Sequence, residues 1–247
     1  MTAEAFRALH HGSAPLILPN AWDPVSARVI AAAGYPAIAT SSGAVARVLG
    51  WDDGQLTPPA EMFQAVARIS RAVDVPVTAD MEAGYGLDPK EFVERLLDAG
   101  AVGCNLEDSA DHQLVDVRRQ ADYLYEVRAA AGADLVINAR VDNFIVGGTV
   151  EDAIARGRAY RKAGADCVYP IAAPLEVLRT LADEIGGPLN AHALPNGPTP
   201  SDLNALGATR ISYGTSLHSF TTDVLRELLP ELTSGPSNGR RRAGGGR

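Results

Sequence analysis

The chain has 247 residues, of which 46% are hydrophobic, so it can bury a sizeable core and suits a single α/β domain of ordinary size. Its net charge of −8 argues against a surface built for nucleic acid or for an anionic membrane, because both need a basic face. No stretch is long and apolar enough for a membrane span, so we expect a soluble cytoplasmic protein without nucleic-acid or membrane partners.

Short β-type runs alternate with stretches of helical periodicity from about residue 16 onward. This order predicts an α/β fold with a parallel sheet wrapped in helices. Eight units of this size suggest a (β/α)8 TIM-type barrel, although a doubly wound open sheet would produce much the same pattern. The strands are expected at 16–20, 37–41, 77–82, 103–107, 135–140, 167–171, 189–192 and 210–213.

Helix starts are marked by a capping residue followed by proline, a pair that suits the first turn of a helix. Such pairs occur at Asp23-Pro24, Thr57-Pro58, Asp88-Pro89 and Thr199-Pro200. The last helix, 217–229, carries apolar residues on one face, and its plain role is to close the barrel. We therefore expect one catalytic domain over 1–233 and a disordered Gly/Arg-rich tail over 234–247.

Two acidic residues end the third expected strand. Asp80 and Glu82 are spaced i, i+2 and should share one face of that strand, with a turn at Gly84 and Gly86 directly after them. Paired carboxylate oxygens suit a hard divalent cation such as magnesium. The alternative is an ion pair at the rim of a barrel.

Polar side chains also collect at the ends of the other expected strands, where barrel enzymes place their active sites. Acids confined there would repel one another unless a cation or an arginine neutralised them. Arg140 is a natural fork for a substrate carboxylate or phosphate, or else the rim partner of the acids. The candidate residues at these positions are Ser41, Ser42, Gly43, Asp53, Glu107, Arg140, Asn190, His192 and Tyr213.

Five segments in order together resemble the isocitrate lyase/phosphoenolpyruvate mutase superfamily, in its phosphoenolpyruvate mutase-like branch. The segments are Pro19-Asn20-Ala21-Trp22-Asp23, Ser41-Ser42-Gly43 followed by Leu49-Gly50-Trp51-Asp52-Asp53, Asp80-Met81-Glu82-Ala83-Gly84-Tyr85-Gly86, Asn105-Leu106-Glu107-Asp108, and Ala139-Arg140-Val141-Asp142-Asn143-Phe144.

The resemblance implies a (β/α)8 barrel whose final helix is exchanged between subunits of a homodimer or homotetramer. It also implies a magnesium-dependent site, with manganese as the alternative ion, for a small anionic substrate. By position, the metal residues would be Asp53, Asp80, Glu82 and Glu107, and the substrate carboxylate would lie against Ser41, Ser42, Gly43 and Arg140. Asn190, on the seventh expected strand, is a further candidate for substrate binding.

The chain departs from the superfamily in the loop 109–116. Lyases of the superfamily carry a cysteine there as a proton donor, and mutases carry lysine and asparagine, but this loop has neither cysteine nor lysine. The candidate proton donors are therefore His112, His192, Tyr213 and metal-bound water, and His192 is preferred because it ends a strand.

The resemblance, together with these residues, implies a magnesium-dependent lyase or decarboxylase that acts on a small α-keto or 2-hydroxy acid through a pyruvate-type enolate. One alternative is a phosphoenolpyruvate/phosphonopyruvate mutase or a phosphonopyruvate hydrolase. The other is a barrel that binds a keto acid without turning it over.

Overall fold

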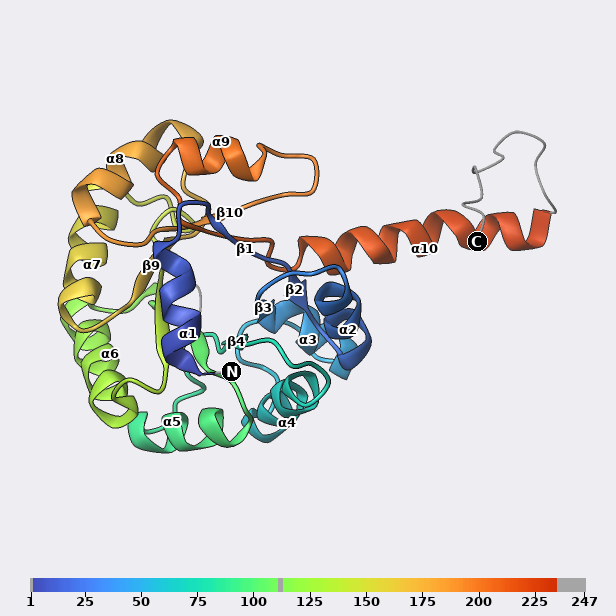
Figure 1. Cartoon of the computed structure of the whole chain (residues 1–247), viewed down its shortest axis with the longest axis horizontal. Helices are drawn as coiled ribbons and strands as arrows, with labels where there is room; N and C mark the ends of the chain where they lie inside the picture. The colour runs from blue at the N-terminus through green and yellow to red at the C-terminus, as the bar shows by residue number, and fades with distance from the viewer. Residues whose placement is uncertain (1, 111–112, 235–247) are drawn as a thin grey trace.

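The computed structural model describes residues 2–110 and 113–234, and it has the expected parallel α/β organisation with helices arranged around the strands (Figure 1). A six-stranded sheet has the order β2-β3-β4-β5-β8-β9, and a three-stranded sheet has the order β1-β11-β10. The strands are β1 (Leu16–Leu18), β2 (Asn20–Ala21), β3 (Ile38–Thr40), β4 (Val77–Asp80), β5 (Gly103–Glu107), β8 (Val136–Val141), β9 (Cys167–Pro170), β10 (Asn190–His192) and β11 (Arg210–Ser212).

All neighbours within these two sheets pair in parallel. The first expected strand is divided at Pro19, which lacks an N–H group, so that β1 pairs with β11 and β2 pairs with β3. An isolated parallel bridge joins Val168 of β9 to Leu189, the residue before β10. The carboxyl ends of the parallel strands therefore lie on one side, as the candidate site requires.

The capping motifs place most helix starts correctly. Asp23 accepts a hydrogen bond of 2.7 Å from the backbone N–H of Ser26 and caps α2, and Asp88 and Thr199 cap α5 and α9. The helices between strands are α2 (Pro24–Ala32), α3 (Ser42–Leu49), α4 (Pro59–Ser70), α5 (Pro89–Asp98), α6 (Val117–Ala131), α7 (Val150–Lys162), α8 (Leu175–Ile185) and α9 (Pro200–Ala205).

Three parts of the structure were not expected from the sequence: a helix after Ser41, a hairpin after β5 and a helical N-terminus. The segment after Ser41 begins helix α3 rather than forming a loop, and a short antiparallel hairpin, β6 (Ser109–Ala110) with β7 (Gln113–Leu114), follows β5. At the N-terminus, α1 (Ala3–Ala8) and the 3-10 turn η1 (Leu9–His11) bury Phe6 against a small apolar cluster that includes Leu18 and Val136. This segment therefore packs against the strands.

The last helix, α10 (Ser216–Ser234), extends away from the rest of the chain (Figure 1). Phe220 and Leu225 on its apolar face are each 53% exposed. In a single chain these side chains are only partly covered, so the structure does not show this helix closing the barrel. The tail expected at 234–247 lies outside the described residues, apart from Ser234.

In the part of the chain that the structure describes, no helix combines the length and the apolar character needed to cross a bilayer.

Candidate active site

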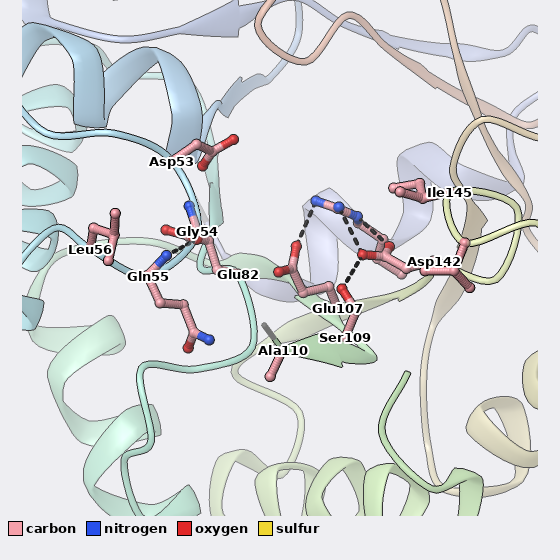
Figure 2. A pocket seen from close by; sticks show the side chains of 12 residues that line it. Asp53, Gly54, Gln55, Leu56, Glu82, Glu107, Ser109, Ala110, Asp142 and Ile145 are labelled. Carbon is pink, nitrogen blue, oxygen red and sulfur yellow. Dashed lines mark hydrogen bonds and ion pairs between the residues drawn. The ribbon is translucent and has the colours of Figure 1, made fainter. Parts of the chain in front are cut away.

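Two cavities lie side by side at the carboxyl ends of the strands. The outer cavity, shown in Figure 2, has a volume of about 690 Å³, and the inner one has a volume of about 140 Å³. Asp53 and Arg140 border both. The outer cavity is also lined by Glu82, Glu107, Ser109 and Asp142, and the inner one by Ser41, Ser42, Gly43, Asp80, Asn105, Tyr169 and His192. The structure thus brings together most of the residues that the sequence singled out.

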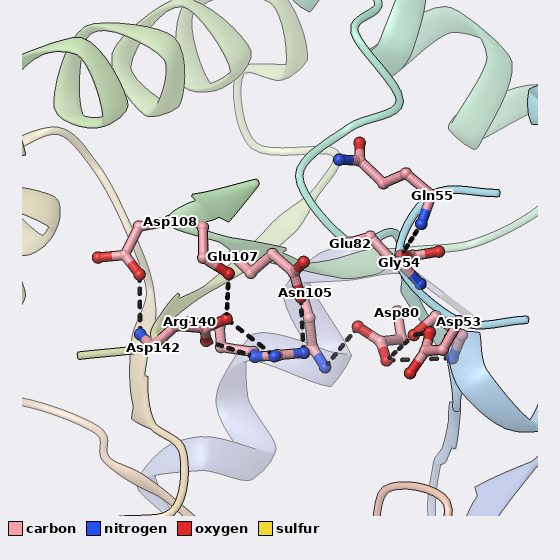
Figure 3. Close-up of polar contacts among 12 residues, drawn as sticks. Asp53, Gly54, Gln55, Asp80, Glu82, Asn105, Glu107, Asp108, Arg140 and Asp142 are labelled. Atoms are coloured by element: carbon pink, nitrogen blue, oxygen red, sulfur yellow. Dashed lines mark hydrogen bonds and ion pairs between the residues drawn. The ribbon is translucent and has the colours of Figure 1, made fainter. Parts of the chain in front are cut away.

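Asp80 and Asp53 meet at the start of helix α3. Oδ2 of Asp80 accepts hydrogen bonds from the backbone N–H of Ser42 at 3.1 Å and from its hydroxyl at 2.9 Å. The same hydroxyl lies 3.4 Å from Oδ1 of Asp53. A Cβ atom at Gly43 would lie 2.6 Å from Oδ2 of Asp53, so only glycine leaves room for this carboxylate. The two acids therefore share one polar corner (Figure 3).

Glu82 does not share a strand face with Asp80, so the expectation from their spacing is wrong. Strand β4 ends at Asp80, and Glu82 follows in a turn with a φ of +49°. Its carboxylate accepts hydrogen bonds from the backbone N–H groups of Gly54, at 3.0 Å, and of Gln55 (Figure 3). It also accepts a hydrogen bond of 2.6 Å from the Tyr85 hydroxyl. Glu82 therefore holds the loop that carries Asp53.

Gln55 and Tyr85 complete this contact between the two loops. Gln55 Oε1 accepts a hydrogen bond of 2.9 Å from the Tyr85 N–H, and both residues have positive φ angles, +63° and +57°. Left-handed backbone is unfavourable for residues other than glycine, and it persists where the surrounding contacts determine it. The loop that positions Asp53 is thus held in a defined, strained conformation.

Arg140 at the end of β8 is held by two carboxylates. Its Nη1 lies 2.6 Å from Oε2 of Glu107, and its Nε and Nη2 lie 2.6 and 2.9 Å from the two oxygens of Asp142 (Figure 3). Although burial alone would lower the pKa of Arg140, the charges of Glu107 and Asp142 raise it overall. One N–H on each terminal nitrogen is left for a ligand.

Asp108 has a structural role. Its side chain is fully buried and accepts hydrogen bonds from Tyr160 at 2.6 Å, from Arg156 at 3.0 Å and from the backbone N–H of Asp142 at 2.8 Å. It does not border either cavity. Asp108 therefore fixes the backbone beneath the Arg140–Asp142 pair.

The candidate proton donors separate in the structure. His192 borders the inner cavity, and its Nε2 lies 3.2 Å from the backbone oxygen of Tyr213, while burial lowers the pKa of the imidazole. Tyr213 borders a different cavity, about 440 Å³ in volume, between α2 and the segment after β10. His112 lies outside the described residues. Asn190 is fully buried and donates to Ser212 at 3.0 Å, so it does not border the inner cavity.

Burial and mutual repulsion act on the acids of the site. Burial raises the pKa of Asp53, and the charge of Asp80 raises it further. Burial also raises the pKa of Glu82, and it raises the pKa of Glu107 well above its ordinary value despite Arg140. Within 2–110 and 113–234, no three His, Cys, Asp or Glu side chains form a ready group of metal ligands. The four acids thus form two groups: the Asp53–Asp80 pair, and Glu82 and Glu107, whose carboxylates are held by donors of the protein.

Asn105 and Tyr169 are among the residues of the inner cavity that the sequence did not single out as ligand contacts. Asn105 donates from Nδ2 to Oδ1 of Asp80 at 3.4 Å, and Tyr169 lies opposite Arg140 in the β8–β9 register. In the sequence, Asn105 stood out only as part of a motif, and Tyr169 lies inside an apolar strand. Only the strand register places their side chains at the cavity, and the sequence does not give this register.

Comparison with known proteins agrees with this geometry. Residues 6–233 match the phosphoenolpyruvate phosphomutase family. Oxaloacetate decarboxylase 2 of Pseudomonas fluorescens (strain Pf0-1) is 32% identical over 261 residues, which cover 94% of this chain and 89% of that protein.

Solved structures show the same relationship. A Burkholderia cenocepacia J2315 protein, provisionally named a phosphonomutase, has a TM-score of 0.88 and 38% identity, with 93% of this chain and 99% of that chain covered. The structure of 2,3-dimethylmalate lyase, a PEP mutase/isocitrate lyase superfamily member, has a TM-score of 0.84 and 25% identity, with 97% and 88% covered. The expected superfamily and the expectation of a carbon–carbon lyase enzyme are confirmed. The chain belongs to the phosphoenolpyruvate phosphomutase family.

Proposed function

We propose that this protein is a divalent-metal-dependent carbon–carbon lyase or decarboxylase for a small α-keto or 2-hydroxy acid. The observation that carries the proposal is the joint presence of the Asp53–Asp80 corner and the Arg140 fork on the same inner cavity. A volume of about 140 Å³ suits a compact substrate of a few carbon atoms. Oxaloacetate-like keto acids and substituted malates match both the cavity and the relatives.

The donor set fits a hard divalent cation. Asp53 and Asp80 approach the same hydroxyl, and burial together with the charge of Asp80 raises the pKa of Asp53, a repulsion that a cation would relieve. Magnesium usually binds through one or two carboxylates and keeps several waters, so a pair of acids is sufficient. We propose that Asp80 and Asp53 hold magnesium, or manganese in its place, and that Glu82 and Glu107 act around it as carboxylates fixed by protein donors.

A bound magnesium ion would supply electrostatic stabilisation of the enolate that forms when the bond beside the keto group breaks. The chain's own residues account for binding and orientation. Arg140 offers its remaining N–H groups to a substrate carboxylate, because Glu107 and Asp142 fix its plane. Ser41, Ser42 and Gly43 border the inner cavity at the start of α3, where the positive end of the helix dipole suits an anionic oxygen.

His192 is the proton donor or acceptor that we propose among the described residues. It borders the inner cavity, and its lowered pKa favours the neutral imidazole near pH 7. Tyr213 points to a different cavity, which does not support such a role. Undiminished turnover of a His192→Ala variant on a confirmed substrate would exclude this assignment.

The fold also favours assembly through α10. We propose that the strand pairings, including the Val168–Leu189 bridge, form a (β/α)8 barrel, and that α10 is exchanged between subunits of a cytoplasmic homodimer or homotetramer. In one chain, α10 projects outward (Figure 1), and a cavity of about 440 Å³ between α2 and the segment after β10 is lined by Val29, Ile30 and Leu194. The apolar face of a neighbour's α10 would fill this cavity.

Sedimentation velocity tests the assembly. The intact protein should sediment as a dimer or tetramer, and Phe220→Asp with Leu225→Asp should shift it to the monomer, because both side chains are half-exposed in one chain. Glu227→Gln on the same helix is the control. A monomeric intact protein would contradict the proposed exchange.

Substrate tests decide the reaction. Oxaloacetate, 2-methylisocitrate, isocitrate and citramalate should be incubated with and without magnesium while pyruvate and glyoxylate release is followed. We expect metal-dependent turnover of at least one of them. Absence of turnover on the whole panel would favour the non-catalytic binding barrel.

The alternative is a phosphonopyruvate mutase or hydrolase, and the similarity to the Burkholderia protein favours it. The loop 109–116 contains no lysine, which speaks against the mutase reaction. Phosphonopyruvate in the same panel, followed by phosphorus NMR, separates the lyase from the mutase or hydrolase. If phosphonopyruvate were converted faster than every carboxylic acid of the panel, the mutase or hydrolase would replace the lyase proposal.

A further inference from the structure

Arg210 is a buried cation that the proposed reaction does not use. It begins strand β11, and its side chain is fully buried. Among the residues that the structure describes, no carboxylate lies within ion-pair distance of it. Its polar partners are neutral: Nη1 lies 3.3 Å from Nε2 of His10, and Nη2 donates to Oδ1 of Asn105 at 3.1 Å. An unpaired buried charge is expensive, so its position calls for an explanation.

His10 is oriented to accept a hydrogen bond from Arg210. Burial and the charge of Arg210 lower the pKa of His10 to about 3, so the imidazole is neutral near pH 7. Its Nδ1 lies 3.0 Å from the backbone oxygen of Phe6, which can only accept. Nδ1 therefore carries the proton, and the unprotonated Nε2 accepts from Arg210.

The orientation of the Asn105 amide follows from the same donors. Arg210 has no acceptor atom, so the Asn105 atom that faces it must be the oxygen. Asn138 donates to this oxygen as well, at 2.8 Å. The Asn105 amide nitrogen therefore faces Oδ1 of Asp80, at 3.4 Å (Figure 3).

We propose that Arg210 is a positioning residue that acts through Asn105 on the carboxylate of Asp80. The resulting chain of contacts from His10 through Arg210 and Asn105 to Asp80, here called the buried bridge, joins the N-terminal segment to the acidic corner. The inference rests on the proposed metal role of Asp80. It assigns a function to a buried charge. An apolar side chain could occupy the same place among the strands without the free-energy cost of removing a charge from water.

The two oxygens of Asp80 are constrained from opposite sides. Ser42 donates to Oδ2 from its backbone and its hydroxyl, and Asn105 donates to Oδ1. With both donors in place, the plane of the carboxylate is fixed and its remaining lone pairs point in defined directions. Loss of the Asn105 donor releases one oxygen, which should weaken a bound cation without removing a ligand.

Direct Mn²⁺ binding, measured by isothermal titration calorimetry and by the EPR signal of the free ion, tests the bridge without any substrate. Asn105→Ala and Arg210→Met should each raise the Mn²⁺ dissociation constant by about 10-fold or more, the usual range for partners of ligating carboxylates. Arg210→Lys keeps one donor and should recover part of the affinity. Cys104→Ala, at a fully buried neighbour of Asn105 on β5, should lower stability but leave the dissociation constant unchanged.

His10→Leu provides a second test at the far end of the bridge, where the fold is less at risk than with an altered strand residue. It removes the acceptor of Arg210 and should raise the Mn²⁺ dissociation constant by a few-fold, on the order of 2 to 5. Unchanged Mn²⁺ affinity in folded Asn105→Ala, Arg210→Met or His10→Leu protein, beside tight binding by the unaltered protein, would overturn the bridge alone. Absence of Mn²⁺ binding by the unaltered protein would instead overturn the proposed metal site on which the bridge rests.

Discussion

Asp80 and Glu82 lie two residues apart, yet the structure gives them different partners. Asp80 ends a regular strand, points into the inner cavity and meets Ser42 and Asn105. Glu82 lies beyond the strand in left-handed backbone, and three protein donors surround its carboxylate. Similar acids in one motif can therefore have different tasks: Asp80 faces the inner cavity, and Glu82 holds the loop that carries Asp53.

The largest effect should come from Asp80. Asp80→Asn removes a charge from the proposed metal site, and we expect kcat/KM on a confirmed substrate to fall by about 100-fold or more, since a metal supplies several kcal/mol of charge stabilisation. Steady-state kinetics at saturating magnesium measures this. As a control, Asp52→Asn, at the exposed residue before Asp53, should keep kcat/KM within about twofold of that of the unaltered protein. A comparable loss of kcat/KM in both variants would contradict a specific role of Asp80 in the reaction.

Glu82→Gln should act on stability first. The amide places an N–H donor among groups that already donate, the N–H groups of Gly54 and Gln55 and the Tyr85 hydroxyl, so the free energy of unfolding should fall by about 1–3 kcal/mol. Urea denaturation measures this change. Tyr85→Phe, which removes a single hydrogen-bond donor to Glu82, should lower the free energy of unfolding by less. If Glu82→Gln left stability unchanged and abolished metal binding, Glu82 would be a ligand rather than a holding group.

Gly43→Ala tests the approach of Asp53 to the corner. A Cβ atom there would lie 2.6 Å from the Asp53 carboxylate and 2.9 Å from Thr215, so Asp53 should move and Mn²⁺ affinity should fall by about tenfold. Gly197→Ala is the matched control, because the nearest atom to its added Cβ is 3.4 Å away. Equal affinities of the two variants would show that Asp53 is not part of the site.

The pH dependence of stability tests the far end of the buried bridge. The native pKa of His10, about 3, lies below its value of about 6.5 in the unfolded chain, so the unfolded state binds the extra proton as pH falls below 6.5. The free energy of unfolding should therefore decrease between pH 6.5 and 3, with a slope of at most about 1.4 kcal/mol per pH unit from this group. Denaturation at several pH values should show a shallower slope for His10→Gln and an unchanged one for His11→Gln, since His11 is exposed. The same slope for His10→Gln as for the unaltered protein would contradict a neutral, buried His10.

Much of the fold follows from local sequence signals. Alternating β-type runs predicted the parallel strands, and Asp23, Asp88 and Thr199 marked helix starts because their side chains cap the first turn. The start of α4 was placed one residue early, at Pro58 instead of Pro59. The apolar face of α10 predicted burial, but in a single chain Phe220 and Leu225 of this helix are about half-exposed.

The candidate site was predictable in membership more than in geometry. Asp53, Asp80, Glu82, Glu107 and Arg140 do gather at one cavity system, as strand-end positions predict. The sequence could not show that Glu82 adopts a positive φ, because such backbone is set by contacts with the distant residues 54 and 55. Nor could it show the contact of Arg210 with Asn105, which depends on two strands 105 residues apart in the chain.

The most direct test of the Asp53–Asp80 metal site is Mn²⁺ binding to the unaltered protein, Asp80→Ala and Glu82→Gln, followed by EPR of the free ion at pH 7.5. The proposal predicts saturable binding by the unaltered protein, no detectable binding by Asp80→Ala, and binding by Glu82→Gln that is weakened but still present. Unchanged binding by Asp80→Ala, or its loss in Glu82→Gln alone, would contradict the division of work between these two acids.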